Sequence, residues 1–145
     1  MPTSTDIATR IAAQVTTSGA VSNVERGRHD AWPEDKTPCA RVYLGQTEIT
    51  PATLSSPRRF FNHIDIIIEV FVRETTTTLV DDALETALAT ITDQLEGDRT
   101  IDGNADAVDL IPISIEREFN GTDGLRPMGL GTMTWRAAYY TQETA

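Results

Sequence analysis

The stretch FFNHIDIIIEVFVR, residues 60 to 73, decides the fold of this chain. Its side chains alternate with a period of two residues, which places successive side chains on opposite faces of a strand. One face is entirely apolar and the opposite face is mixed, so we expect a long strand with only one face against the core. The apolar face consists of Ile64, Ile66, Ile68, Val70 and Val72.

Two segments with helical periodicity lie on either side of this strand in the sequence. Apolar residues recur at helical spacing over residues 4 to 17, and Ser18 and Gly19 stop that pattern. A second apolar stripe runs from Leu79 to Leu95 and ends at Gly97. Each helix is therefore amphipathic, and we expect both to cover the apolar face of the sheet.

Shorter alternating runs predict the other strands of the sheet. They are residues 20 to 25, 39 to 45, 110 to 119 and 132 to 142. The order of helix, strands, helix and strands is typical of an α+β fold. We expect two helices packed on one face of a mixed, mostly antiparallel sheet of four to five strands. The 145 residues suffice for one hydrophobic core, so we expect a single domain.

Four segments without periodicity predict long loops, which in compact domains are usually functional or disordered. They are rich in glycine, proline and polar residues, and they span residues 26 to 38, 46 to 59, 97 to 109 and 120 to 131. The last of them contains Gly129 and Gly131, which we expect in a glycine-rich hairpin connection.

The charge of the chain excludes several classes of partner. With 22 acidic and 12 basic residues the formal net charge is -10, which argues against nucleic acid or anionic lipid as a ligand. The longest apolar run is too short to span a bilayer. The first six residues lack the layout of a signal peptide, so we expect synthesis and use in a reducing cytoplasm. The single Cys39 agrees, since it allows no intrachain disulfide.

Residue types that are typical of catalytic and metal-binding sites do not occur here in a spacing typical of such sites. His29 with Asp30 and His63 with Asp65 are candidate metal ligands, but they lack the spacing typical of such sites. Surface polar residues are the simpler interpretation. Cys39 heads an apolar strand and is expected to be a small buried side chain. We therefore predict no catalytic residue, no cofactor and no metal, and we expect a protein that is not an enzyme.

Several segments together resemble one known family, the minor tail protein U family. Its members are the tail terminators of long-tailed bacteriophages such as lambda. The stretch PCARVYLG at residues 38 to 45 is similar to a strand of that family, and Ile68-Glu69-Val70-Phe71 is similar to its long strand. The N-terminal helix that ends at Ser18 and Gly19, the helix from Leu79 to Leu95 and the closing strand from Thr132 to Gln142 match in place. The resemblance covers most of the chain.

The resemblance implies a structural virion protein of the phage tail or neck, assembled in the host bacterial cytoplasm. Such a protein forms a hexameric ring that caps the tail tube, ends its polymerisation and offers a surface to the head-tail connector protein. Its implied partners are its own copies, the tail tube protein and the connector. Genome DNA would pass through the ring without sequence-specific binding.

The uneven charge predicts which surfaces meet in such a ring. Residues 81 to 109 contain nine acidic residues and one basic residue, whereas residues 26 to 59 are weakly basic. A closed ring needs two different, complementary surfaces on each copy. We expect these to include Arg26, Arg28, Arg58 and Arg59 on one side and Asp81, Asp82 and Glu85 on the other. The alternatives are a head-tail connector or stopper protein of the neck and, more distantly, a small-molecule-binding α+β domain.

Overall fold

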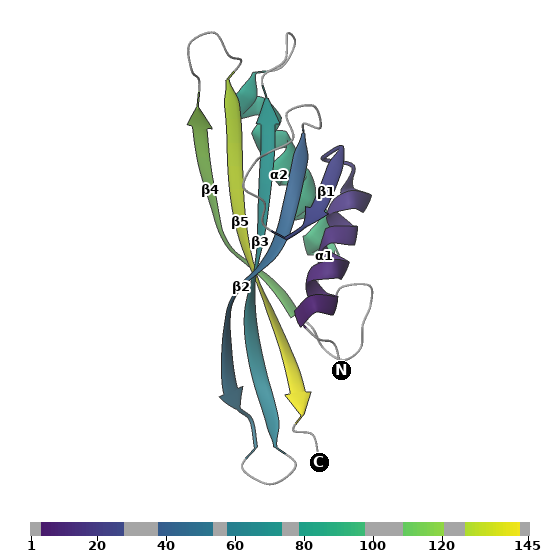
Figure 1. Ribbon diagram of the computed structural model, residues 1–145, viewed down its shortest axis with the longest axis vertical. Coiled ribbons are helices and arrows are strands. Elements are labelled where there is room, and N and C mark those ends of the chain that lie inside the picture. The colour runs from purple at the N-terminus through teal and green to yellow at the C-terminus, as the bar shows by residue number, and fades with distance from the viewer. Residues whose placement is uncertain are drawn as a thin grey trace.

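The chain forms two helices and five strands, which Figure 1 shows as one elongated arrangement. The structure is a computed structural model that describes residues 4–27, 38–53, 58–73, 79–97, 109–120 and 127–142. In chain order the elements are α1 (Ser4–Ser18), β1 (Asn23–Arg26), β2 (Cys39–Pro51), β3 (Arg59–Arg73), α2 (Val80–Gly97), β4 (Asp109–Asn120) and β5 (Met128–Gln142).

The five strands form one mixed sheet in the order β1-β2-β3-β5-β4. The strand β3 lies at the centre and pairs antiparallel with β2 on one side and with β5 on the other. Its pairing with β5 is unbroken from Arg59 opposite Gln142 to Arg73 opposite Met128. The strand β4 pairs antiparallel with the far side of β5, and only β1 and β2 are parallel. The predicted α+β fold, with helices on a mostly antiparallel sheet, is confirmed.

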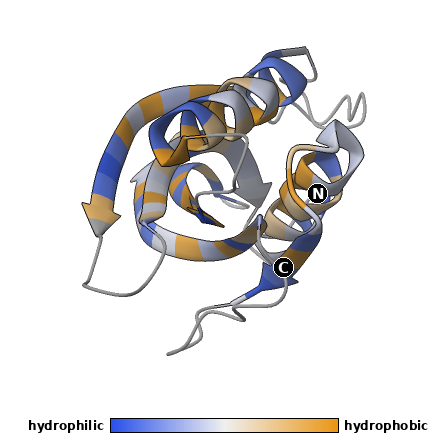
Figure 2. Cartoon of the chain, turned by 90° about the horizontal axis from the view of Figure 1, so that it is seen from above, coloured by the Kyte–Doolittle hydropathy of each residue, from blue (hydrophilic) through white to orange (hydrophobic). Residues whose placement is uncertain are grey.

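The core lies between the two helices and the apolar face of β3. The predicted side chains from Ile64 to Val72 on that face are each 3% exposed or less. Hydrophobic and hydrophilic residues alternate along the strands in Figure 2, as expected for a sheet that buries one face. The helices contribute their apolar stripes, namely Ile7, Ala8, Ile11 and Val15 of α1 and Leu84, Leu88, Ile91 and Leu95 of α2. The opposite face of β3 is mixed but not fully exposed, since Phe71 is also buried.

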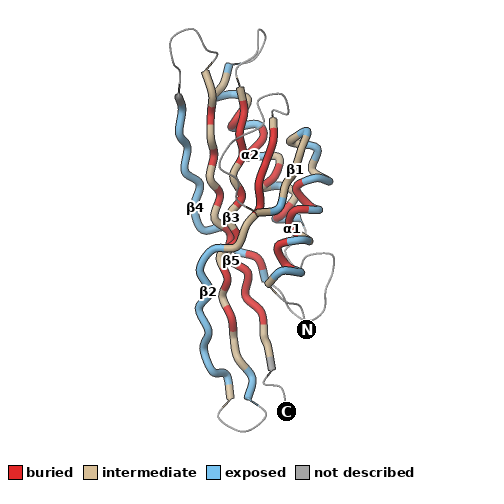
Figure 3. Tube along the Cα trace, viewed as in Figure 1, coloured by how far each residue is buried: buried red, intermediate tan, exposed pale blue. Residues whose placement is uncertain are grey.

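Three strands continue beyond the helices as an arm, which projects at the lower end of Figures 1 and 3. The arm consists of residues 47–51 of β2, 59–63 of β3 and 139–142 of β5. Pairing of β1 with β2 stops at Val42, and pairing of β4 with β5 starts at Ala138, so neither outer strand reaches the arm. The part of β2 in the arm is exposed throughout.

The predicted loop at residues 46 to 59 is partly wrong, because the structure has strands there. Residues 46 to 51 continue β2 and pair with β3 after a bulge between Leu44 and Thr47. Backbone hydrogen bonds extend the pairing, because the amide of Ala52 donates to the carbonyl of Arg59 over 2.8 Å. These residues lack an apolar period because the helices do not cover either face of β2 there. Residues 54 to 57 lie outside the described residues.

The predicted glycine-rich loop at residues 120 to 131 is also partly wrong. Residues 128 to 131 belong to β5, and Gly129 and Gly131 are buried in the sheet beneath α2. Residues 121 to 126 lie outside the described part of the chain. So do most residues of the loops predicted at 26 to 38 and 97 to 109, whose first and last residues belong to or adjoin β1, β2, α2 and β4.

Candidate functional site

The charged groups expected at an interface lie at opposite ends of the sheet. Arg59 begins β3 in the arm, whereas the first turns of α2 pack beside the far end of β3 and the start of β5. The 15 residues of β3 span on the order of 45 Å, so the two groups cannot meet within one copy. Figure 1 shows this separation along the long axis of the molecule.

The basic end is organised around aromatic side chains of the arm. The guanidinium of Arg59 lies over the ring of Tyr140, 4.9 Å from its centroid. Phe61 contacts Tyr140 across the strands, with ring centroids 5.0 Å apart, and it contacts His63 edge-on at 4.6 Å. Arg58 is exposed next to Arg59. The arm therefore carries two exposed arginines at its end, one of them steadied by a cation–π contact.

The other two predicted arginines do not lie in the arm. Arg26 ends β1, and its Nη1 donates a hydrogen bond to the carbonyl of Val42 over 2.6 Å. This bond ties Arg26 to the neighbouring strand. Arg28 lies outside the described residues.

The acidic end combines the first turns of α2 with the adjacent part of β4. Asp81 and Asp82 are exposed in the first turn of α2, where acidic side chains favour the helix N-terminus. Glu85 accepts two hydrogen bonds from the guanidinium of Arg117 on β4, of which the one from Nη2 to Oε2 is 3.2 Å long. Sequence patterns do not reveal this pair, because its partners lie 32 residues apart on different elements. Glu85 is therefore engaged within its own chain.

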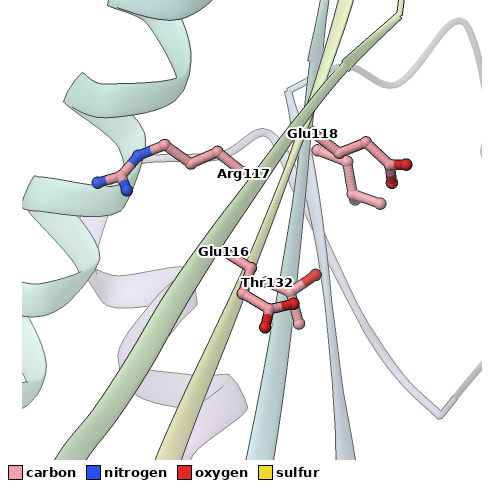
Figure 4. Close-up of a pocket in the computed structure, with 5 residues that line it drawn as sticks. Glu116, Arg117, Glu118 and Thr132 are labelled. Atoms are coloured by element: carbon pink, nitrogen blue, oxygen red, sulfur yellow. The ribbon is translucent and has the colours of Figure 1, made fainter.

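The outer face of β4 and β5 forms a shallow depression with a volume of about 470 Å³. Glu116, Glu118, Leu130 and Thr132 line it, while Arg117 extends from the same strand toward α2 (Figure 4). The depression contains two carboxylates, and Arg117, the cation among its lining residues, pairs with Glu85 of α2. The depression adds these two carboxylates to the acidic end.

Polar side chains elsewhere on the sheet pair with one another. Asp65 accepts a hydrogen bond of 3.1 Å from Nε of Arg136, and the hydroxyl of Tyr43 donates to Glu69. His63 packs edge-on against Phe61, and His29 and Asp30 lie outside the described residues. Among the described residues, no group of three or more His, Cys, Asp or Glu side chains gathers where it could hold a metal ion.

Cys39 lies at the start of β2 and is buried, as expected. Burial raises the pKa of its thiol from 9.0 to about 11, because the thiolate would lose its hydration. The nearby Arg41 lowers this pKa and Glu25 raises it, both by smaller amounts than burial does. Such a thiol stays protonated at neutral pH, which suits a packing role.

Comparisons with known proteins give similarities to solved structures only. No protein-family model and no curated protein sequence matches the chain. A chain in the solved structure of the virion of a native gene transfer agent particle is similar, with 16% sequence identity and a TM-score of 0.49. The match covers 90% of this chain and 84% of the other. Neither described helix is long and apolar enough to cross a membrane.

Proposed function

We propose that this protein is a structural, non-enzymatic virion component of a long-tailed bacteriophage that acts as a ring-forming tail terminator. Its ring, a hexamer by the resemblance of the sequence, caps the tail tube, ends tube polymerisation and presents a surface to the head-tail connector protein. The observation that supports this best is the separation of two oppositely charged surfaces at the two ends of one elongated sheet. Head-to-tail contacts between different surfaces close into rings, whereas contacts between identical surfaces stop at dimers.

The polar chemistry of the sheet also favours a structural role. Asp65 with Arg136 and Tyr43 with Glu69 pair across neighbouring strands, so these groups stabilise the sheet. In the proposed ring, Arg58 and Arg59 of one copy approach Asp81 and Asp82 of the next. A ring of subunits with net charge -10 suits a passage for DNA, because it offers few fixed cations that could bind the phosphates.

The proposal is tested by adding the purified protein to polymerising tail tubes of the phage that encodes it. We expect electron microscopy to show a ring at one end of each tube, and we expect tube elongation to stop at that end. The capped tubes should then bind the connector protein, while bare tubes should not. A protein that binds the connector but leaves tube growth unchanged would be a neck stopper instead, and this outcome would overturn the proposal.

A further inference from the structure

The depression on β4 and β5 carries two carboxylates with no cation beside them in the described part of the chain. It lies at the open edge of the sheet, since β4 pairs only with β5 among the described strands. Glu116 and Glu118 point to its side of β4, whereas Arg117 points away toward Glu85 (Figure 4). Alternate side chains of a strand lie about 7 Å apart on one face. Two carboxylates at this distance repel each other and favour a cation between them.

The end of the arm carries an exposed cation whose position is fixed. The guanidinium of Arg59 lies over the ring of Tyr140, which restricts the side chain without neutralising its charge. No acidic side chain among the described residues forms an ion pair with it. An arginine presents several N–H donors in a rigid fork, so a single guanidinium can bind two carboxylates at once.

These two surfaces are too far apart to meet within one copy. Glu116 is opposite Thr132 of β5, and Thr132 is opposite Glu69 of β3. The length of β3 from Arg59 to Glu69 is on the order of 30 Å. The cation of the arm can therefore reach the depression only in another copy of the chain.

We propose that the guanidinium of Arg59 of one copy enters the depression of the next copy and lies between Glu116 and Glu118. This inference rests on the proposed ring and names the carboxylates of the acidic end that receive the arm. The aliphatic part of the arginine packs on Leu130, which lines the depression. The contact is made by side chains at the end of the arm, so it requires no strand pairing between copies. Two different surfaces meet, as the closure of a head-to-tail ring requires.

The one carboxylate of the described arm does not oppose this contact. Glu48 lies opposite His63, and His63 is about 13 Å along β3 from Arg59. Only the end of the arm enters the depression, so Glu48 stays outside it. At physiological salt, charges more than about 8 Å apart in water are largely screened from each other.

Other acidic groups of the next copy are weaker partners for this arginine. Asp81 accepts a hydrogen bond of 2.9 Å from the amide of Asp82 at the start of α2. Asp93 and Glu96 project from the exposed side of the same helix. Such a site leaves a bound cation largely in water, where ion pairs contribute little. The depression instead offers two carboxylates and an apolar side chain to one guanidinium.

Charge reversal on each side tests this contact in the full-length protein. The arm variant is Arg59→Glu, and the depression variant combines Glu116→Arg with Glu118→Arg. Circular dichroism with urea unfolding checks that both are folded. Ring formation is measured by native mass spectrometry, and by capping of tail tubes if the wild type assembles only there.

Each variant has a control with the same change of net charge. Arg10→Glu on α1 matches the arm variant, and Asp93→Arg with Glu96→Arg on α2 matches the depression variant. We expect each variant alone to assemble at least about tenfold more weakly than its control. The second comparison is the sharper one, because its smaller net negative charge reduces general repulsion and would by itself promote assembly.

An equimolar mixture of the two variants restores both contacts. The reversed arm then meets two arginines in the depression, and the unchanged arm meets two glutamates. We expect the mixture to form rings that contain equal numbers of the two variants in alternation.

A mixture that stays unassembled, or variants that assemble like their controls, would overturn this contact while leaving the terminator proposal standing. A wild type that neither forms rings nor caps tubes would overturn the terminator proposal. Association of the two variants as dimers on mixing would in that case still support the contact itself.

Discussion

Gly131 of β5 lies directly beneath Leu88 of α2, so closely that a Cβ atom on Gly131 would be 2.9 Å from Cδ2 of Leu88. The same atom would lie 3.1 Å from Cδ1 of Leu88 and 3.2 Å from Cδ1 of Leu84. Leu88 is 2% exposed, so it has little room to move away. The helix α2 can therefore pack this close to β5 only because residue 131 has no side chain.

Replacing Gly131 by alanine should destabilise the protein by about 1 to 3 kcal/mol, because the added methyl group overpacks the core. Urea unfolding of the variant measures this loss. Gly97→Ala is the control, since a Cβ there meets nothing within 4 Å. Shortening the neighbour in Gly131→Ala with Leu88→Val should cost less than the sum of the two single changes. A loss for Gly131→Ala no larger than that of the control would contradict the close contact.

The apolar face of β3 supplies a second stability prediction. Ile68 is fully buried between the sheet and the helices, so Ile68→Ala should cost about 2 to 5 kcal/mol through lost burial and the cavity left behind. Ile67 is the matched control, because it is the adjacent isoleucine on the opposite, half-buried face. Ile67→Ala should cost clearly less in the same urea experiment. A loss under about 1 kcal/mol for Ile68→Ala would show that its face is not the core.

The central strand and both helices could be predicted from the sequence because burial imposes a period on them. Ile64 to Val72 must alternate to place one face on the core, and the stripe from Leu79 to Leu95 must follow the helical repeat. Residues 46 to 51 carry no such period, since the arm has no helix against it. Gly129 and Gly131 resemble turn residues, and their actual role depends on α2, which is remote in the sequence.

The candidate interface could be predicted only in part, for a similar reason. The excess of acidic residues after Asp81 is visible in the sequence, and so are Arg58 and Arg59. Their placement at opposite ends of β3 follows from the strand order, which local patterns do not contain. The pair between Glu85 and Arg117 depends on how α2 crosses β4, and the open edge of β4 depends on the insertion of β5 beside β3.

Charge reversal in the arm should weaken the proposed ring. Arg58→Glu combined with Arg59→Glu removes the two exposed cations that we propose to face the acidic end of the next copy. Wild-type copies of charge -10 also repel one another, so we expect added salt or magnesium to promote their assembly. Repulsion should dominate because each exposed ion pair contributes only about 0 to 1 kcal/mol. Light scattering across a salt and magnesium series measures the ring fraction of both proteins.

Arg10→Glu combined with Thr5→Glu and Thr9→Asp on α1 serves as the control for a changed net charge, because it changes the charge by the same -4 on a helix away from the arm. Equal ring fractions for the wild type and the arm variant at every salt concentration would remove Arg58 and Arg59 from the interface. A wild-type ring that dissociates as salt rises would contradict the dominance of repulsion.

Buried Cys39 should make stability depend on pH in the alkaline range. Its thiol ionises near 9 in the unfolded chain and near 11 in the folded one, because burial raises its pKa. Between these values only the unfolded state releases the proton, so the free energy of unfolding falls as pH rises, by at most about 1.4 kcal/mol per pH unit from this group. Burial also raises the pKa of Tyr139, which acts in the same direction at higher pH.

The comparison with Cys39→Ala isolates the contribution of the thiol, because Tyr139 is present in both proteins. Urea unfolding at pH 8, 9 and 10 should show a steeper decline for the wild type. Parallel declines in the two proteins would mean that the thiol ionises equally in the folded and unfolded states.

The place of β5 between β3 and β4 determines when the protein can fold during its synthesis. When β3 and β4 have left the ribosome, the strand that joins them has still to be translated, and Arg59 finds its partner only when Gln142 emerges. Until then both strands expose apolar residues to other nascent chains. Contacts between residues so distant in sequence also form slowly. We therefore expect this chain to depend most on chaperones in the moments before β5 is complete.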